Sequence, residues 1–251
     1  YFICAAIYLY GSWRSVLGWA IGCLVAYWLM LTLVPVPGYG PGVLSPMGNF
    51  AGYVDRLFLQ NHMWTKANDW DPEGILSTIP SVSTMLFGVL AGCFLRRGGE
   101  SRETKTGWLF LAGVSMFSLG LFLDHLMPIN KMIWTVSFAV LMAGVSTSVF
   151  ACFYWLIDVQ GYKRWSKAAV VFGMNSIAIY VFASLLEDAL IDFRIVSIAG
   201  EWVSPQRFLG GYVLGPFLSP ANVSLVCAIL MVLVAYGVAL ALYRKQWFIR
   251  V

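Results

Sequence analysis

Apolar residues occur along this 251-residue chain in runs of about 20, separated by short segments that are polar or rich in proline and glycine. A helix of that length crosses a hydrocarbon layer of ~30 Å at ~1.5 Å per residue. The pattern therefore predicts an all-α, polytopic transmembrane helix bundle in a single domain, 1–251. The expected elements are a partial span at 1–10 and six full spans at about 15–34, 77–95, 108–127, 133–157, 168–190 and 221–242.

The composition excludes a water-soluble globular protein. Hydrophobic residues make up 60% of the chain and charged residues 11%, against about 25% charged residues in soluble domains. The net charge of +4 does not indicate a nucleic-acid partner, because basic residues of membrane proteins mainly mark cytoplasmic loops. The five cysteines lie in apolar runs and match neither a metal cluster nor a disulfide framework. The bilayer is the expected partner, no metal is expected, and a homodimer is left open.

The distribution of Lys and Arg predicts the orientation. Eleven of them fall on one side of the predicted spans and five on the other, which places the richer side in the cytoplasm. The long segments 35–76 and 191–220 then form outward loops, and the C-terminus is cytoplasmic. Neither loop contains cysteine, and the Asn222 sequon lies at the start of a span. We therefore expect a bacterial cytoplasmic (inner) membrane.

The first outward loop ends in the segment Asp71-Pro72-Glu73-Gly74. This order is typical of a helix start, with Asp71 as N-cap, proline in the first turn and Glu73 near the positive end of the helix dipole. The two carboxylates are also candidates for binding a polar or cationic substrate, such as an amine, at the membrane face. A cap and a binding site are compatible, so both interpretations stay open.

Other polar residues of the outward segments are candidates because charges are rare in this chain. Asp55 and Arg56 lie in the same loop, and Asn130 and Lys131 lie in the tight turn before the fourth full span. Lys131 could meet an anionic group or place its ammonium in the interface. Together with Asp71 and Glu73, these residues are the outward candidates for substrate binding.

Two polar residues, Asn175 and Ser176, lie near the middle of the predicted span 168–190. Polar groups are costly at that depth and usually face the interior of a bundle. They indicate either an interhelical hydrogen bond, worth on the order of 1 kcal/mol, or substrate binding. The histidines His62 and His125 lie in a loop and at a span end, where interfacial roles are favoured. The chain has no glycine-rich phosphate loop, zinc-binding spacing or nucleophile elbow.

Seven short motifs follow one another along nearly the whole chain: Leu33-Val34-Pro35-Val36-Pro37-Gly38, Gly52-Tyr53-Val54-Asp55-Arg56-Leu57, Asp71-Pro72-Glu73-Gly74-Ile75-Leu76-Ser77-Thr78-Ile79, Gly88-Val89-Leu90-Ala91-Gly92, Ile129-Asn130-Lys131-Met132-Ile133-Trp134, Gly173-Met174-Asn175-Ser176 and Tyr243-Arg244-Lys245. In this order and spacing, they together resemble the heparan-α-glucosaminide N-acetyltransferase family and its bacterial relatives. The resemblance implies a transmembrane acyltransferase that takes acetyl from cytoplasmic acetyl-CoA and delivers it to the amine of a terminal glucosamine across the membrane. Acetyl-CoA is then the co-substrate, and an amino sugar or glycan is the acceptor.

The inner basic residues are candidates for attracting a CoA phosphate, although the positive-inside rule explains them without a ligand. They are Arg96, Arg97, Lys163 and Arg164. A hypothesis consistent with both the residues and the resemblance holds the acceptor amine near Asp71, Glu73 and Asn130, with Asn175 orienting the acetyl group or polarising its carbonyl.

The resemblance does not assign a catalytic residue in this chain. The family's catalytic histidine belongs to an outward loop upstream of the matched region, so neither His62 nor His125 inherits its role. The chain begins inside an apolar run without an initiator Met, and we expect further helices upstream in the natural protein. Three alternatives stay open: an amino-sugar permease, transfer to another outward glycan, and a non-catalytic membrane scaffold.

Overall fold

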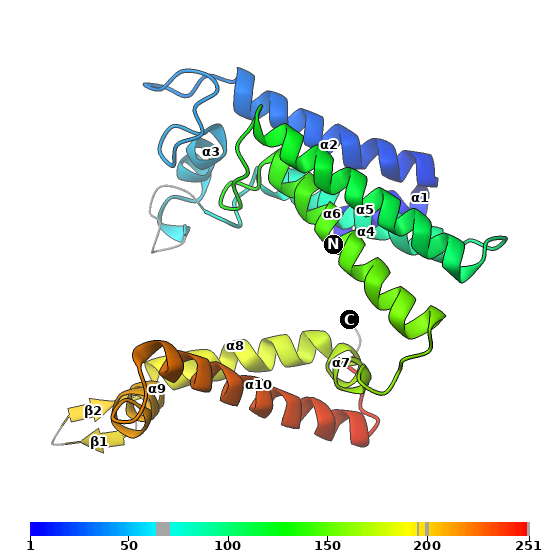
Figure 1. Ribbon diagram of the computed structural model, residues 1–251. Helices are drawn as coiled ribbons and strands as arrows, with labels where there is room; N and C mark the ends of the chain where they lie inside the picture. The colour runs from blue at the N-terminus through cyan, green and yellow to red at the C-terminus, as the bar shows by residue number, and fades with distance from the viewer. Residues whose placement is uncertain (64–70, 195, 199–200, 250–251) are drawn as a thin grey trace. The chain divides into compact units, whose positions relative to one another are not determined.

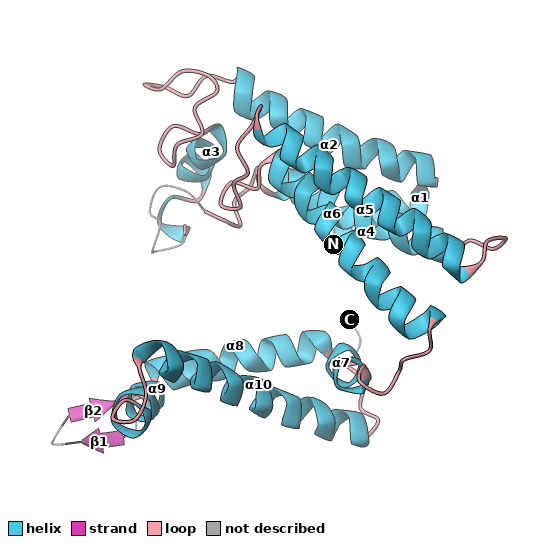
Figure 2. Ribbon diagram, in the orientation of Figure 1, coloured by secondary structure: helices cyan, strands magenta, loops and turns pink. Residues whose placement is uncertain are grey.

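The computed structural model describes residues 1–63, 71–194, 196–198 and 201–249. It confirms the all-α class: in the described part of the chain, strands occur only as one short hairpin (Figure 2). The chain forms two compact units, Tyr1–Gly161 and Tyr162–Val251. Each unit is described by itself.

The first unit is a bundle of antiparallel helices (Figure 1). Its long helices start where local caps favour a start. Ser101, for example, accepts a hydrogen bond from the Thr104 backbone N–H at 3.1 Å and so begins a helix six residues before the predicted 108. The elements are α1 (Phe2–Tyr10), α2 (Trp13–Leu33), α3 (Phe50–Phe58), η1 (Gln60–His62), α4 (Thr78–Arg96), α5 (Arg102–Asp124), α6 (Val136–Tyr154) and the π-helical turn η2 (Trp155–Val159).

Glycines bring α5 and α6 into close contact. A side chain on Gly113 would overlap Ser148, and one on Gly144 would overlap the backbone of α5 at Phe117. Small residues of this kind allow two helix backbones to approach in a membrane, where packing rather than the hydrophobic effect holds helices together. Ser148 therefore lies in the contact between α5 and α6.

One end of the bundle carries the loops that contain the outward candidates. Here α2 and α5 end, α4 and α6 begin, and α3 covers them (Figure 1); we call this the α3 end. A buried cluster built on Tyr27, Met127 and Val136 lies there, and Leu76 and Trp134 pack against it from two different loops. The two loops are thus fixed on one core.

The second unit consists of helices around α10, which packs against α7 and α8 through Val171, Ile179, Ala235 and Ala239. The segment predicted as the loop 191–220 contains a two-stranded antiparallel hairpin and further helical turns. The elements are α7 (Lys167–Gly173), α8 (Ser176–Asp192), β1 (Val196–Ile198), β2 (Glu201–Val203), α9 (Pro205–Arg207), η3 (Phe208–Leu214) and α10 (Pro220–Arg244).

Five described helices are long and apolar enough to cross a membrane. A sixth span exists if α7 and α8 count as one, but these two are bent by 81° at Met174 and Asn175. The prediction of a continuous helix over 168–190 was therefore wrong at its centre. The physical reason is that the buried Asn175 side chain bonds to the C-terminal segment, as described below, and its backbone leaves the helical conformation (φ −135°, ψ 36°).

The predicted helix start at Asp71 was also wrong. Residues 71–77 form successive turns, and α4 begins at Thr78. The physical reason is that the Ile75 backbone N–H bonds to the Asp55 side chain of α3. The backbone at this turn therefore does not continue into the hydrogen bonds of a helix.

Candidate functional site

The short helix α3 positions the only buried carboxylate in the described part of the α3 end. Asn49 caps α3 through its Oδ1 atom, which accepts a hydrogen bond from the Gly52 backbone N–H at 2.6 Å. Its Nδ2 atom donates to the carbonyls of Ser45 and Pro46. The cap fixes the helix rotation that turns Ala51 and Asp55 inward. The Asp55 side chain is 2% exposed.

The Asp55 carboxylate holds the turn that precedes α4. Its Oδ1 atom accepts a hydrogen bond from the Ile75 backbone N–H at 2.9 Å. Gly74 lies against the same carboxylate so closely that any side chain there would overlap it. Burial raises the pKa of the Asp55 carboxyl above its ordinary value of 3.8, whereas hydrogen bonds from the backbone N–H groups of Ile75 and Asp71 oppose that rise. Asp55 therefore acts as a cap supplied from another helix.

This contact places Asp71 and Glu73 at the bundle end. The Asp71 Oδ1 atom accepts a hydrogen bond from the Glu73 backbone N–H at 2.8 Å, the local turn that Asp favours. Asp71 is half-buried and Glu73 is exposed. Arg56 donates from Nη2 to the Met47 carbonyl at 2.7 Å. The structure thus places Asp55 beside the turn that carries Asp71 and Glu73, with Arg56 next to Asp55 in α3.

The turn that carries Asn130 and Lys131 is fixed by Thr135, which is fully buried. The Thr135 hydroxyl accepts a hydrogen bond from the Asn130 backbone N–H at 2.9 Å and donates to the Pro128 carbonyl. Asn130 Oδ1 accepts from the Met132 backbone N–H at 2.8 Å, so this oxygen is already engaged. Lys131 is exposed.

Tyr27 and Thr135 are positioning residues that the sequence reasoning missed. The Tyr27 hydroxyl donates to the Ile133 carbonyl and ties the 128–135 turn to α2. A tyrosine inside an apolar run needs such a partner for its hydroxyl, and this need was the available signal. Thr135 gave no comparable signal, because threonine is common at helix starts.

The basic candidates divide between the two units. Arg96 and Arg97 are exposed at the C-terminal end of α4, opposite the α3 end. Lys163 and Arg164 are exposed just before α7, in the second unit. A further inner residue, Lys105, is buried and donates from Nζ to the carbonyls of Leu95 at 2.8 Å and Arg97 at 2.5 Å.

Asn175 joins the α7–α8 break to the end of the chain. Its Nδ2 atom donates to the Trp247 carbonyl at 3.0 Å, and its Oδ1 atom accepts from the Ile249 backbone N–H at 2.9 Å. The side chain is 1% exposed. Ser176, by contrast, is exposed and borders an apolar hollow with Tyr180. The Asn175 side chain therefore forms hydrogen bonds, as one of the two alternatives expected, but its partners lie in the C-terminal segment and not in a neighbouring helix.

No family model matches the chain. Two curated proteins, heparan-alpha-glucosaminide N-acetyltransferase from Homo sapiens and its counterpart from Mus musculus, are each 30% identical to it, over 195 and 197 residues. The chain is related to the heparan-α-glucosaminide N-acetyltransferase family. The match covers 66% of this chain and 29% of each acetyltransferase, so the chain spans under a third of the length of these relatives.

Proposed function

We propose that the protein acts as a membrane-bound N-acetyltransferase, which moves acetyl from acetyl-CoA to the amine of a glucosamine-type sugar or glycan. The sequence relationship to the two named acetyltransferases carries this proposal. In the net reaction, the C–S bond of the thioester breaks, an amide bond forms between the acetyl group and the amine nitrogen, and the CoA thiol leaves. The amine must lose a proton to a base as the amide forms.

The acceptor site of the proposal is the α3 end. A protonated amine is attracted by the carboxylates of Asp71 and Glu73, which the Asp55 contact holds in one turn. Lys131, exposed on the neighbouring turn, would meet an anionic group of a glycan, and Asn130 would orient that turn. The acyl-accepting group and the base are not assigned, and neither His62 nor His125 is proposed for them.

The donor side of the proposal is the opposite end of the bundle. Arg96 and Arg97 lie at the far end of α4 from Asp71, and a helix of 19 residues is about 28 Å long. Two ligand sites on opposite membrane faces fit this separation. We propose that these arginines attract the CoA phosphates. Lys163 and Arg164, in the second unit, are separate candidates for the same role.

Asn175 has a positioning role in this proposal. Both polar atoms of its amide bond to the backbone near the C-terminus, so it would hold the α7–α8 break rather than polarise the acetyl carbonyl. Ser176, exposed beside it, is left as the candidate for a direct contact at this break.

The test is acetyl transfer by the natural full-length protein in proteoliposomes, with labelled acetyl-CoA on one side and glucosamine on the other. We expect kcat/KM for glucosamine to fall by about tenfold or more in Glu73→Ala and in Asp71→Asn, the scale of one lost charge-assisted contact. Glu100→Ala, an exposed loop carboxylate at the opposite end, is the matched control. Wild-type rates in both Glu73→Ala and Asp71→Asn would show that these residues do not belong to the acceptor site. Absence of transfer by the wild-type protein would refute the proposed function.

The orientation that this function needs puts Arg96 and the C-terminus in the cytoplasm, and we propose the bacterial inner membrane as the location. To test this orientation, Arg97→Cys and Glu73→Cys, each in a protein without other reactive thiols, are treated with a membrane-impermeant thiol reagent in intact cells. Labelling only at position 73 is expected, and labelling only at position 97 would reverse the topology.

A permease for amino sugars is the second candidate, because one observation favours it. The break between α7 and α8, with its 81° bend, is the kind of discontinuous helix that forms substrate sites in many secondary transporters. The structure thus contains one broken helix, which the sequence did not show. Uptake of labelled glucosamine into proteoliposomes without acetyl-CoA would favour the permease, and uptake only as the N-acetyl product would exclude it.

A further inference from the structure

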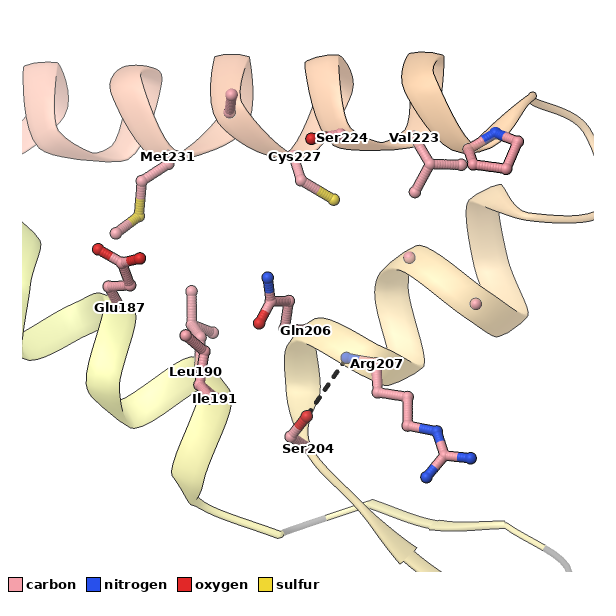
Figure 3. A pocket seen from close by; sticks show the side chains of 14 residues that line it. Glu187, Leu190, Ile191, Ser204, Gln206, Arg207, Val223, Ser224, Cys227 and Met231 are labelled. Atoms are coloured by element: carbon pink, nitrogen blue, oxygen red, sulfur yellow. Dashed lines mark hydrogen bonds between the residues drawn. The ribbon is translucent and has the colours of Figure 1, made fainter. Parts of the chain in front are cut away.

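A cavity of about 670 Å³ lies inside the second unit, and the proposed acetyl transfer gives it no role (Figure 3). Its walls are the C-terminal part of α8, the segment from Ser204 through η3, and the first half of α10. A volume of this size is typical of small-molecule sites, which occupy about 300–1,000 Å³. All of its lining residues belong to the described part of one unit, so its shape follows from that unit alone.

Two glycines of the π-helical segment η3 leave room for the cavity. Gly210 and Gly211 line it, and a side chain added at Gly211 would meet nothing within 4 Å. Single π-helical stretches are rare and often occur at functional sites. The opposite wall is mainly apolar, with Leu190 from α8 and Cys227 and Met231 from α10.

One negative charge faces this apolar space. Figure 3 shows the Glu187 carboxylate directed toward Met231, and the Gln206 amide directed into the gap between α8 and α10. Arg207 also lines the cavity, with its guanidinium directed away from Glu187 in the same view. Among the described residues, none forms a hydrogen bond or ion pair with the side chain of Glu187 or of Gln206. The cavity therefore offers an unpaired carboxylate and an unpaired amide beside apolar walls.

We propose that this cavity binds an amphipathic primary amine, with its ammonium on Glu187 and its apolar body along Leu190, Cys227 and Met231. A cation is favoured because the carboxylate has no other partner, and the Gln206 carbonyl oxygen can accept a further ammonium hydrogen. An apolar body is favoured because the remaining wall would desolvate the hydroxyls of a sugar without replacing their hydrogen bonds. The site is thus chemically distinct from the glucosamine site proposed at the α3 end.

A free alkylamine and the ethanolamine headgroup of a phospholipid share this chemistry. Both carry a primary ammonium on an apolar body, and α10 is one of the candidate membrane spans. The two sources are separated by using octylammonium and phosphatidylethanolamine as different probes, with octanol and phosphatidylcholine as the corresponding controls without a primary amine.

The experiment follows the reaction of Cys227 with N-ethylmaleimide in the purified full-length protein. Peptide mass spectrometry separates this cysteine from the other cysteines of the protein. Octylammonium is expected to slow the modification of Cys227 severalfold, and octanol at the same concentration is expected to have little effect. In nanodiscs, phosphatidylethanolamine would protect Cys227 relative to phosphatidylcholine if lipid is the natural source. Protection by either amine supports the proposal and identifies the source.

Two variants test the assigned contacts. Glu187→Gln keeps the shape and removes the charge, and should weaken protection by octylammonium about fivefold, the scale of a solvent-accessible ion pair. Asp188→Asn, a neighbouring exposed carboxylate outside the cavity lining, is the matched control and should leave it unchanged. Gly211→Leu should abolish protection by filling the cavity, for which its open surroundings leave space.

Three results would overturn the proposal. Equal protection by octanol and octylammonium would leave no role for the ammonium. Equal affinity for octylammonium in wild type and in Glu187→Gln would show that the Glu187 carboxylate does not bind the ammonium. A Cys227 that does not react in ligand-free protein would show that the cavity is closed. None of these depends on acetyl transfer, so failure of that activity and failure of this site are distinguishable.

Discussion

The carboxylate of Asp55 accepts the backbone hydrogen bond of Ile75, 20 residues further along the chain, at 2.9 Å. One buried side chain therefore takes the place of a local helix cap and fixes the turn with Asp71 and Glu73 at the α3 end.

Gly74→Ala should destabilise the protein, because a methyl group there overlaps the Asp55 carboxylate. The expected loss is about 1–3 kcal/mol, the usual cost of overpacking a tight contact. Thermal unfolding in detergent, followed by tryptophan fluorescence, measures it. Gly88→Ala is the matched control, since a side chain at Gly88 in α4 meets nothing within 4 Å and should be neutral or slightly stabilising. Equal melting temperatures for the two variants would contradict the contact.

The titration of Asp55 should make stability depend on pH. The folded-state pKa of Asp55 is raised above 3.8, so the folded protein holds this proton more tightly than the unfolded chain. The protonated Asp55 carboxyl therefore stabilises the fold fully below pH 3.8, and this stabilisation is lost as pH rises through the folded-state pKa of Asp55. Relative to Asp55→Asn, which does not titrate, the wild-type melting temperature should fall as pH rises above 3.8 and then level off. A constant difference from pH 4 to pH 8 would show that Asp55 is not desolvated.

Asn175→Ala should release the C-terminal segment. The substitution removes both hydrogen bonds to the backbone of Trp247 and Ile249 and leaves buried polar groups unpaired, at a cost of about 1–3 kcal/mol. Limited proteolysis near the C-terminus should accelerate severalfold. Ser176→Ala, the exposed neighbour, should behave as wild type. If the proteolysis rate of Asn175→Ala were also unchanged, the tie to the C-terminal segment would be absent.

Lys105→Met should loosen the end of α4. The buried ammonium donates to the carbonyls of Leu95 and Arg97, which the helix itself leaves without partners. Methionine keeps the apolar stem but offers no donor, so the melting temperature should drop by several degrees, in keeping with a loss of about 1–3 kcal/mol. Hydrogen exchange should rise at residues 93–97. Arg97→Met, at an exposed position, is the control, and an equal effect in both variants would argue against the cap.

The length and purity of the apolar runs determined most of the fold. A run such as 77–95 has few polar positions, so its backbone must satisfy its own hydrogen bonds in a helix, and α4 spans Thr78–Arg96. The same scarcity of charge identified part of the candidate site, because Asp55, Asp71 and Glu73 stand out in a chain with 11% charged residues. Their grouping followed from their place in one loop.

Tertiary structure decided where those apolar runs break and which polar side chains already have hydrogen-bond partners. The break at Asn175 depends on backbone atoms 72 and 74 residues away, and the turn at Asp71 depends on a carboxylate of α3. Local propensity cannot register such partners, because both segments taken alone favour a helix. The cavity beside Glu187 likewise exists only after α8, η3 and α10 pack together. The sequence by itself therefore determined the spans through backbone hydrogen bonding, whereas long-range polar contacts set the geometry of the sites.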